Sequence, residues 1–227
     1  MERSLSLRST KLPPYPFGLA GCSSSFVLPQ GWAWVRLANL VEQSEAGWSP
    51  SCESHPRKQG EWGVLKVSAV SWGEFRPQEN KALPSNLEPR TQYEVQSGDF
   101  LVSRANTAEL VAKSVLVEDT PSQLMLSDKI VRLKLFHSIV GKFINMVNLS
   151  PESRCYYVRV AGGTSSSMKN VSREQILNLL IPLPPLAEQE RIVAKVDQLL
   201  ALCDQLTERT VLGAAENTQL LRALIHT

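Results

Sequence analysis

The sequence predicts a mixed α/β (α+β) fold, with a β-rich domain followed by a long, projecting C-terminal helix of coiled-coil type. Two observations carry this prediction. Short apolar segments rich in β-branched residues, separated by turns, lie before residue 136, where the hydrophobic period changes from two residues to nearly four. The proline-rich stretch IPLPP (181–185) then precedes a run whose apolar side chains recur three and four residues apart.

Several short strands are expected in the β-rich part. WGVLKVSAV (62–70), FLVS (100–103) and KSVLVED (113–119) are apolar and rich in β-branched residues. KIVRLKL (129–135) alternates apolar with basic side chains, which predicts a half-buried strand with a basic outer face. The polar loop at 44–60 is a candidate for specificity, although nothing in it singles out one residue.

Three helical segments are expected after the strands. Apolar spacing predicts one helix over 136–149, and Ser150-Pro151 is typical of the cap and first turn of a second helix. Ser172, followed by Gln175 three residues later, indicates a capping box at the start of a third. Residues 180–185 must be extended, because each proline disfavours helix in the residue before it.

The last segment, 185–227, is predicted to be one long helix. Pro185 suits a first helical turn. The spacing of the apolar residues that follow predicts a seam for a partner or for dimerisation. The alternative is that this stripe packs on its own domain, and Gly213 is a candidate break. The seam residues are Ile192, Val196, Leu199, Cys203 and Leu206.

Length, composition and charge are compatible with many functions. The chain has 227 residues, of which 43% are hydrophobic, enough for one medium domain plus an appendage. Residues 185–227 hold four Lys/Arg and six Asp/Glu, so the remainder of this +2 chain is mildly basic and compatible with a nucleic-acid partner. Residues 1–27 lack the apolar core of a signal peptide and are interpreted as a flexible extension. A cytoplasmic location is therefore expected.

No motif in the sequence predicts catalysis. The histidines His55, His137 and His226 lie far apart, and there is no GxGxxG, GxxxxGK(S/T) or (N/D)PP(Y/F) motif. The four cysteines form no CxxC pair, which predicts unpaired thiols and no zinc cluster. We therefore expect no catalytic residue, no metal site and no cofactor bound by this chain.

Six segments together resemble the specificity (S) subunit of type I restriction–modification systems. The most specific is the proline-rich hinge followed by the E-Q-x-R-I-V start of a long helix. The resemblance covers nearly all of residues 28–210. The segments are LPQGWAWVRLANL (28–40), WGVLKVSAVSWGEF (62–75), SGDFLVSRANT (97–107), SDKIVRLKL (127–135), GGTSSSMKNVS (162–172) and IPLPPLAEQERIVAKVDQLL (181–200).

This resemblance implies a non-catalytic subunit that reads one half of a bipartite duplex DNA target. It would position methyltransferase (M) subunits and, through them, restriction endonuclease (R) subunits, which would use S-adenosylmethionine, ATP and Mg. A full-length member resembles two such units in tandem, whereas this chain carries one target-recognition domain (28–184) and one spacer helix (185–227). A homodimer through the C-terminal helix would restore the two-fold arrangement and imply a palindromic split site.

Two other functions stay open at this point. One is an unrecognised nuclease or methyltransferase. The other is a non-reading scaffold or degenerate half-subunit, which would bind the methyltransferase subunit through its helix without reading DNA.

Polar residues beside the expected strands are the DNA-binding candidates. Arginine suits guanine and asparagine suits adenine in the major groove, and a loop before a helix N-terminus can hold a phosphate. The alternative is that Arg104 and Asn106 only cap a turn, and that each lysine is a solvated surface charge. The candidates are Arg104, Asn106 and Thr107 after the strand at 100–103, Thr164, Ser165, Ser166 and Lys169 before a helix, and Lys81 and Lys113 as phosphate contacts.

Overall fold

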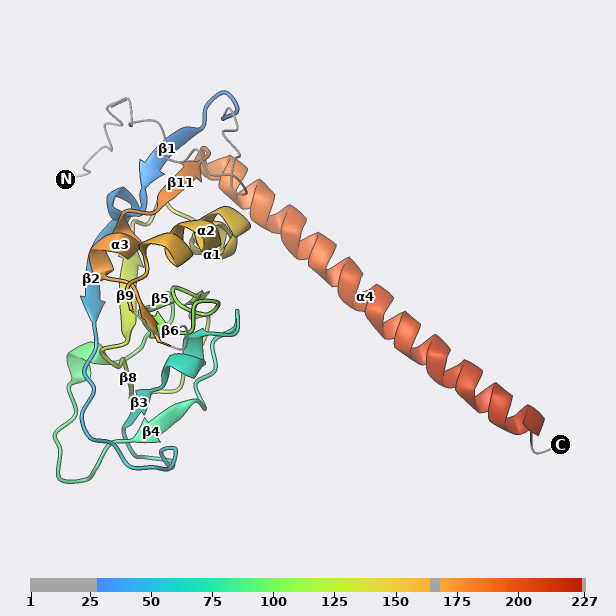
Figure 1. The fold of residues 1–227 in the computed structure, drawn as a ribbon, viewed down its shortest axis with the longest axis horizontal. Coiled ribbons are helices and arrows are strands. Elements are labelled where there is room, and N and C mark those ends of the chain that lie inside the picture. Colours follow the sequence, from blue (N-terminus) through green and yellow to red (C-terminus); the bar gives the residue numbers. More distant parts are fainter. Residues whose placement is uncertain (1–27, 164–167, 226–227) are drawn as a thin grey trace. The chain divides into compact units, whose positions relative to one another are not determined.

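A computed structural model describes residues 28–163 and 168–225, with side chains described up to Thr210. The chain forms two compact units, Met1–Pro184 (unit 1) and Pro185–Thr227 (unit 2) (Figure 1). The extension expected at 1–27 and the candidates Thr164, Ser165 and Ser166 lie outside the described residues.

A four-stranded antiparallel sheet forms the middle of unit 1. Its order is β2 (Val41–Ala46), β9 (Ile130–Leu135), β5 (Phe100–Ser103) and β7 (Ser114–Leu116). Each residue of β5 is buried, which agrees with the unbroken apolar run that predicted this strand. The strand predicted over 100–103 is therefore confirmed, with the same first and last residues.

Helices cover one face of this sheet. Ser114 stands opposite Val102, and its hydroxyl donates to Asn145 Oδ1 at 2.7 Å, so α1 (Gly141–Leu149) lies on that face. Asn148 on α1 donates to Ser114 Oγ at 2.8 Å and accepts from the Tyr157 hydroxyl at 2.7 Å. Tyr157 belongs to α2 (Pro151–Val160), which begins at the predicted Ser150 cap.

The other face packs on a smaller sheet. That sheet has the order β4 (Asn80–Ala82), β3 (Gly63–Leu65) and β8 (Leu124–Met125), and β3 runs parallel to β8. Leu101 and Ile130 from the four-stranded sheet join Leu65, Leu124 and neighbouring residues in one buried core. The two sheets are therefore held together by apolar burial rather than by strand pairing.

Arg132 corrects the prediction of a basic outer face on β9. Its side chain is only 4% exposed, and it forms ion pairs with Glu45 Oε1 at 2.7 Å and Asp99 Oδ2 at 3.0 Å. It also donates to the backbone carbonyls of Gln92 and Glu94, both at 2.7 Å. Because β9 lies between β2 and β5 and is covered on both faces at Arg132, the alternating pattern does not place this residue in water, whereas Lys134 near the strand end is half-buried.

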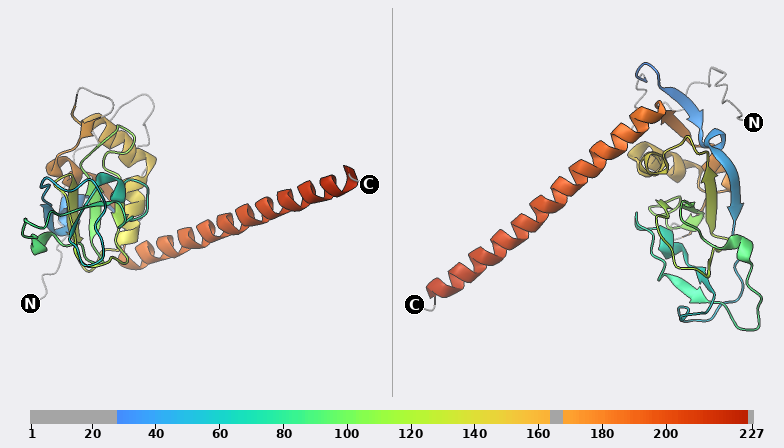
Figure 2. Two further views of the ribbon diagram at one scale, coloured as in Figure 1. Left: turned by 90° about the horizontal axis from the view of Figure 1, so that it is seen from below. Right: turned by 180° about the vertical axis from the view of Figure 1, so that it is seen from behind.

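The segments at which the described chain enters and leaves unit 1 lie next to each other. β1 (Ala33–Arg36) pairs antiparallel with β11 (Leu180–Leu183), and Arg36 donates to Asn178 Oδ1 at 3.0 Å. α3 (Arg173–Leu177) precedes β11 and carries the predicted capping box. In Figure 1 and in the right-hand view of Figure 2, the pair β1–β11 lies near α1–α3 at one end of unit 1, and β3 and β4 lie at the other.

Three predicted segments are shorter than expected, and the one predicted over 113–119 forms a strand only in β7, Ser114–Leu116. The strand predicted over 62–70 ends at Leu65 and continues as a 3₁₀ turn, η2 (Val67–Val70). The helix predicted over 136–149 begins only at Gly141. The Phe136 amide donates to Leu40 O, so the pairing of β9 with the chain at the start of β2 continues one residue past Leu135. Two further short 3₁₀ turns, η1 (Leu37–Leu40) and η3 (Thr91–Tyr93), complete the connections.

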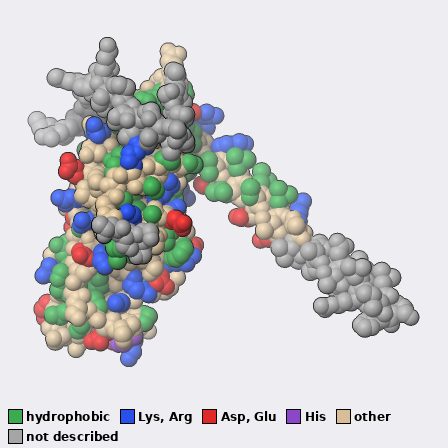
Figure 3. Space-filling model, viewed as in Figure 1, with side chains coloured by type: hydrophobic (Ala, Val, Ile, Leu, Met, Phe, Trp, Pro, Cys, Tyr) green, Lys and Arg blue, Asp and Glu red, His purple; other side chains and the backbone are tan. Residues whose placement is uncertain are grey.

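Unit 2 is a single helix, α4 (Leu186–Ile225), of 40 residues and therefore about 60 Å long. Gly213 does not break it. All residues from Asp197 to Thr210 are exposed, including Leu199, Leu202 and Leu206, whose exposed fractions are 49%, 54% and 63%. Hydrophobic side chains accordingly appear along the described part of α4 in Figure 3. The predicted long helix is confirmed, whereas its coiled-coil pairing stays a prediction.

The cysteines agree only in part with the prediction of unpaired thiols. Cys52 and Cys203 are free thiols. Cys155 is disulfide-bonded, so the prediction is wrong for this residue. Spacing along a sequence does not reveal which cysteines meet in space, and this is why the sequence pattern missed the bond.

Candidate nucleic-acid interface

Asn106 joins three segments of unit 1 that are far apart in sequence. It lies on β6 (Ala105–Asn106), opposite Lys169 on β10 (Lys169–Asn170). Its side-chain Nδ2 donates to Ser71 Oγ at 2.9 Å, and its Oδ1 accepts from the Thr107 amide at 2.9 Å. We call the meeting of 71–76, 104–107 and 168–170 the three-segment site.

Arg104 marks the point where the chain leaves the four-stranded sheet for the β6–β10 pair. Its amide donates to Lys129 O at 2.7 Å, and its carbonyl accepts from the Val171 amide at 2.9 Å. Its half-buried side chain makes one long contact, from Nε to Val171 O at 3.4 Å. The backbone is therefore fixed, while most of the guanidinium N–H groups form no hydrogen bond with the described residues.

The segment 71–76 is a closed turn that presents Trp72. The Arg76 amide donates to Ala69 O at 3.0 Å, and the Ser71 hydroxyl donates to Val67 O at 2.7 Å. Gly73 has φ = +84°, a conformation that residues with a Cβ rarely adopt. Trp72 is 55% exposed, and the Arg76 guanidinium lies 5.7 Å from the centre of its ring.

Lys169 helps to close the loop that precedes it. Its Nζ donates to Gly163 O at 2.6 Å, and Gly162 and Asn170 exchange two backbone hydrogen bonds of 2.8 and 3.0 Å. Gly163 has φ = +113°, and a Cβ there would lie 2.5 Å from Met168 O, so a glycine is needed. Met168, at the end of this loop, is 50% exposed.

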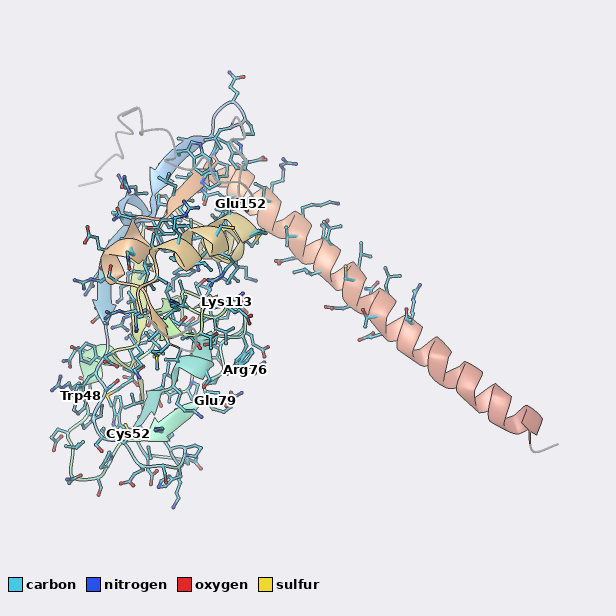
Figure 4. The ribbon with its side chains drawn as sticks, in the orientation of Figure 1. Trp48, Cys52, Arg76, Glu79, Lys113 and Glu152 are labelled. Carbon is cyan, nitrogen blue, oxygen red and sulfur yellow. The ribbon has the colours of Figure 1, made fainter. Side chains whose placement is uncertain are left out.

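The three-segment site carries more positive than negative charge. Arg104 and Lys169 have no ion pair among the described residues, and Arg76 is paired with Glu74 at 2.7 Å. Lys113 follows the turn that leaves β6, and its carbonyl accepts from the Ser103 amide at 2.9 Å. In Figure 4, Arg76 and Lys113 lie on the same side of unit 1.

Lys81 lies elsewhere. It is exposed on β4, opposite Val64, and no described contact joins it to the three-segment site. Burial raises the pKa of the neighbouring Cys52 thiol, although the positive charge of Lys81 opposes this rise. The same strand region holds an ion pair between Lys66 Nζ and Glu79 Oε2 at 2.7 Å, and hydrogen bonds from Lys66 and Ser68 lower the pKa of Glu79.

The structure thus brings four candidates together: Arg104, Asn106, Thr107 and Lys169. Both amide atoms of Asn106 are already engaged within the protein, which favours the structural alternative for this residue. A DNA contact by any of the nine candidates stays a prediction. The sequence pattern did not single out Trp72 as a member of the site, although Trp72 lies in WGVLKVSAVSWGEF (62–75), one of the six segments that carry the resemblance.

The segment 44–60, predicted to be a polar loop, begins within β2, and its remainder from Gly47 on is anchored on another part of unit 1. The amide of Trp48 donates to Leu126 O at 2.9 Å, and the Arg90 guanidinium lies 4.1 Å from the centre of the Trp48 ring. Gly47 passes so close to Leu126 that an added Cβ would overlap its carbonyl. Trp48 lies on the opposite side from Arg76 in Figure 4, so this loop is separate from the three-segment site.

Within residues 28–163 and 168–210, no group of three or more His, Cys, Asp or Glu side chains is placed to hold a metal ion. No helix in the described part of the chain is both long and apolar enough to cross a lipid bilayer.

Residues 29–213 match the family model described as the type I restriction modification DNA specificity domain. The chain belongs to this family. The specificity subunit of the type I restriction enzyme EcoEI from Escherichia coli is 41% identical over 197 residues, which cover 86% of this chain and 33% of that protein. The EcoKI specificity subunit from E. coli K12 is 26% identical over 71% of this chain and 35% of its own length.

Solved structures have the same fold as this member of the family. A chain from work on complex assembly and conformational transition of the type I R-M system aligns with a TM-score of 0.60 and 23% identity, over 86% of this chain and 45% of that one. The HsdS subunit from Thermoanaerobacter tengcongensis aligns with a TM-score of 0.52 and 21% identity, over 81% and 41%. The chain therefore spans about a third of the curated relatives' length.

Proposed function

We propose that this chain is a non-catalytic specificity subunit of a type I restriction–modification complex, in which unit 1 binds duplex DNA and reads one half of a bipartite target. The observation that carries the proposal is the family match over 29–213, which includes almost all the described residues of unit 1 and the first part of α4. Such a protein would act in the cytoplasm, where its DNA lies.

The three-segment site is the proposed DNA-facing surface. Arg104 combines a fixed backbone with unused guanidinium donors, as a residue that reads guanine requires. Lys169 and Lys113 are proposed to contact phosphates, which position the protein without reading sequence. Thr107 has an amide held by Asn106, and its hydroxyl is proposed to donate to the DNA.

Unit 2 is proposed to be the spacer and the partner-binding helix. Its exposed residues Leu199, Cys203 and Leu206 lie on the predicted seam, which Ile192 and Val196 extend toward the helix start. An apolar face of this kind is stabilised when a second helix covers it. The proposed partners are methyltransferase subunits, restriction subunits through them, and a second copy of this chain. S-adenosylmethionine, ATP and Mg would be used by the partner subunits.

Salt-dependent DNA binding tests the proposal. A fluorescein-labelled 40-bp duplex library with 20 random base pairs is titrated with the full chain, and anisotropy is followed between 50 and 200 mM NaCl. We expect the affinity to fall at least about tenfold over this range, because several phosphate contacts release counterions. An affinity that does not change with salt would contradict a DNA-binding role.

Selection from the same library separates a reader from a non-reading scaffold. A reader enriches one sequence class over successive rounds, whereas a scaffold that only binds the methyltransferase subunit enriches none. Incubation of the pure chain with duplex DNA, Mg and S-adenosylmethionine provides a further check. Cleavage or methyl transfer without partner subunits would contradict a non-catalytic role.

A further inference from the structure

We infer that Trp72 is a DNA-contact residue whose indole ring packs against nucleotides of the bound duplex, with Arg76 holding the ring at the surface. This inference rests on the proposed function and assigns a role to a residue that the candidate list did not contain. It concerns duplex DNA because that is the target in the proposed function, and the excess of positive charge in the three-segment site suits a polyanion.

Exposure makes Trp72 unusual within unit 1. Tryptophan is on average one of the most buried residue types, yet Trp72 is 55% exposed. The described residues of unit 1 contain two other exposed large hydrophobic side chains, Met168 at 50% and Val158 at 56%. A single exposed apolar residue needs no explanation, but Trp72 and Met168 both belong to the three-segment site.

The backbone holds Trp72 in a fixed position. Ser71 accepts from Asn106 Nδ2 and donates to Val67 O, so the residue before Trp72 is bonded on two sides. The bond from the Arg76 amide to Ala69 O closes the turn. A ring presented on such a turn loses little conformational freedom when it binds, which favours affinity.

Arg76 connects the ring to the charges of the site. Its guanidinium lies 5.7 Å from the Trp72 ring centre, and its Nε and Nη2 bond to Glu74 at 2.8 and 2.7 Å. Arg104 and Lys169 lie on the other two segments of the site without acidic partners among the described residues. An exposed aromatic ring with a guanidinium against it, and further cations on the adjoining segments, is suited to apolar contacts with sugars and thymine methyl groups of a duplex while the cations contact phosphates.

Asn106 uses both polar atoms of its side-chain amide in hydrogen bonds within the protein. Its amide connects the turn that carries Trp72 to the strand pair that carries Lys169. The residue therefore acts as a positioning residue, which sets the aromatic ring and the lysine at a fixed separation.

Fluorescence and anisotropy together test the inference on the full chain with the 40-bp duplex library at 50 mM NaCl. Five tryptophans contribute to the emission, so the difference between wild type and Trp72→Phe isolates Trp72. We expect DNA to quench this difference signal. Trp72→Ala should weaken binding about 5- to 30-fold, as for the loss of one aromatic anchor of an interface, and Trp72→Phe should weaken it less.

Val158→Ala is the matched control, because Val158 is equally exposed but lies on α2, outside the three-segment site. It should bind as wild type does, and all variants should share one urea midpoint. If the urea midpoint of a variant shifts, the quenching of Trp72 emission by DNA in the wild-type chain decides whether Trp72 contacts DNA. Unquenched Trp72 emission together with unchanged binding by Trp72→Ala overturns the inference and leaves the proposed function standing. Absence of binding by every form overturns both.

Discussion

Replacing Arg132 by methionine should destabilise unit 1 strongly. The five N–H groups of its guanidinium account for five hydrogen bonds, to Glu45 Oε1 twice, to Asp99 Oδ2 and to the carbonyls of Gln92 and Glu94. Removing the cation leaves Asp99, whose side chain is 4% exposed, and Glu45, 22% exposed, without their counter-charge.

The size of the effect follows from burial rather than from counting bonds. Five charge-assisted bonds at about 1.5–3 kcal/mol each would by themselves equal the whole stability of a typical domain, so they cannot be summed. Breaking a buried ion pair by removing one partner costs about 3–5 kcal/mol. With a urea slope of about 2 kcal/mol/M, the midpoint should fall by about 1.5–2.5 M.

Burial by itself would lower the pKa of Arg132, but the hydrogen bonds that it donates to Glu45 and Asp99, together with their negative charges, raise it. The side chain is therefore charged over the whole accessible pH range, and Arg132→Lys tests geometry rather than charge. Lysine offers three N–H donors in place of the five donors of a planar guanidinium. We therefore expect Arg132→Lys to be less stable than wild type but more stable than Arg132→Met.

Urea unfolding at pH 7, followed by tryptophan fluorescence, provides the measurement. Arg76→Met is the matched control, because it removes an ion pair whose side chains are 37% and 67% exposed, and such pairs contribute at most about 1 kcal/mol. Equal losses for Arg132→Met and Arg76→Met would refute the reasoning, since burial would then not determine the strength of the pair.

Three other changes give further predictions. Glu79→Gln should make unit 1 less sensitive to acid, because the pKa of Glu79 is lowered in the folded state. The ionised carboxylate stabilises the fold at pH values above its unfolded-state pKa, and this contribution is lost as the pH falls through its folded-state pKa. Urea midpoints at pH 6 and pH 3 measure this, and at this partly exposed site the difference should stay under about 1 kcal/mol. Ser172→Ala should cost about 0.5–2 kcal/mol, because the α3 capping box is lost, and hydrogen exchange at the Gln175 amide should rise. Leu199→Glu with Leu206→Glu should shift the chain toward monomer in sedimentation experiments, because charge would replace exposed apolar surface on α4. A sedimentation profile equal to that of wild type would argue against pairing through this face.

Local signals in the sequence predicted the elements that local chemistry controls. The Ser150 and Ser172 caps, the buried strand at 100–103 and the long C-terminal helix all depend on residues within a few positions of one another. The burial of Arg132 was missed because it depends on Glu45 and Asp99, which are 87 and 33 residues away.

The candidate site shows the same limit. The segment 104–107 was singled out because polar residues follow a strand, but its connection to Ser71 spans 35 residues and could not be read from spacing. Exposure of Trp72 was equally invisible, because a tryptophan after an apolar run suggests core packing. The strand predicted over 62–70 ran too long because β-branched residues also fit the 3₁₀ turn that follows Leu65.

The pairing of β1 with β11 has a consequence for how such proteins diversify. Because Ala33 stands opposite Leu183, a cassette of about 150 residues begins and ends at one place, and its removal or exchange requires no new path across the fold. Gene fusion, duplication or recombination could therefore splice one whole cassette for another. In a lineage built from this module, the strand pair at the splice point would stay intact while all the residues between its two strands are exchanged.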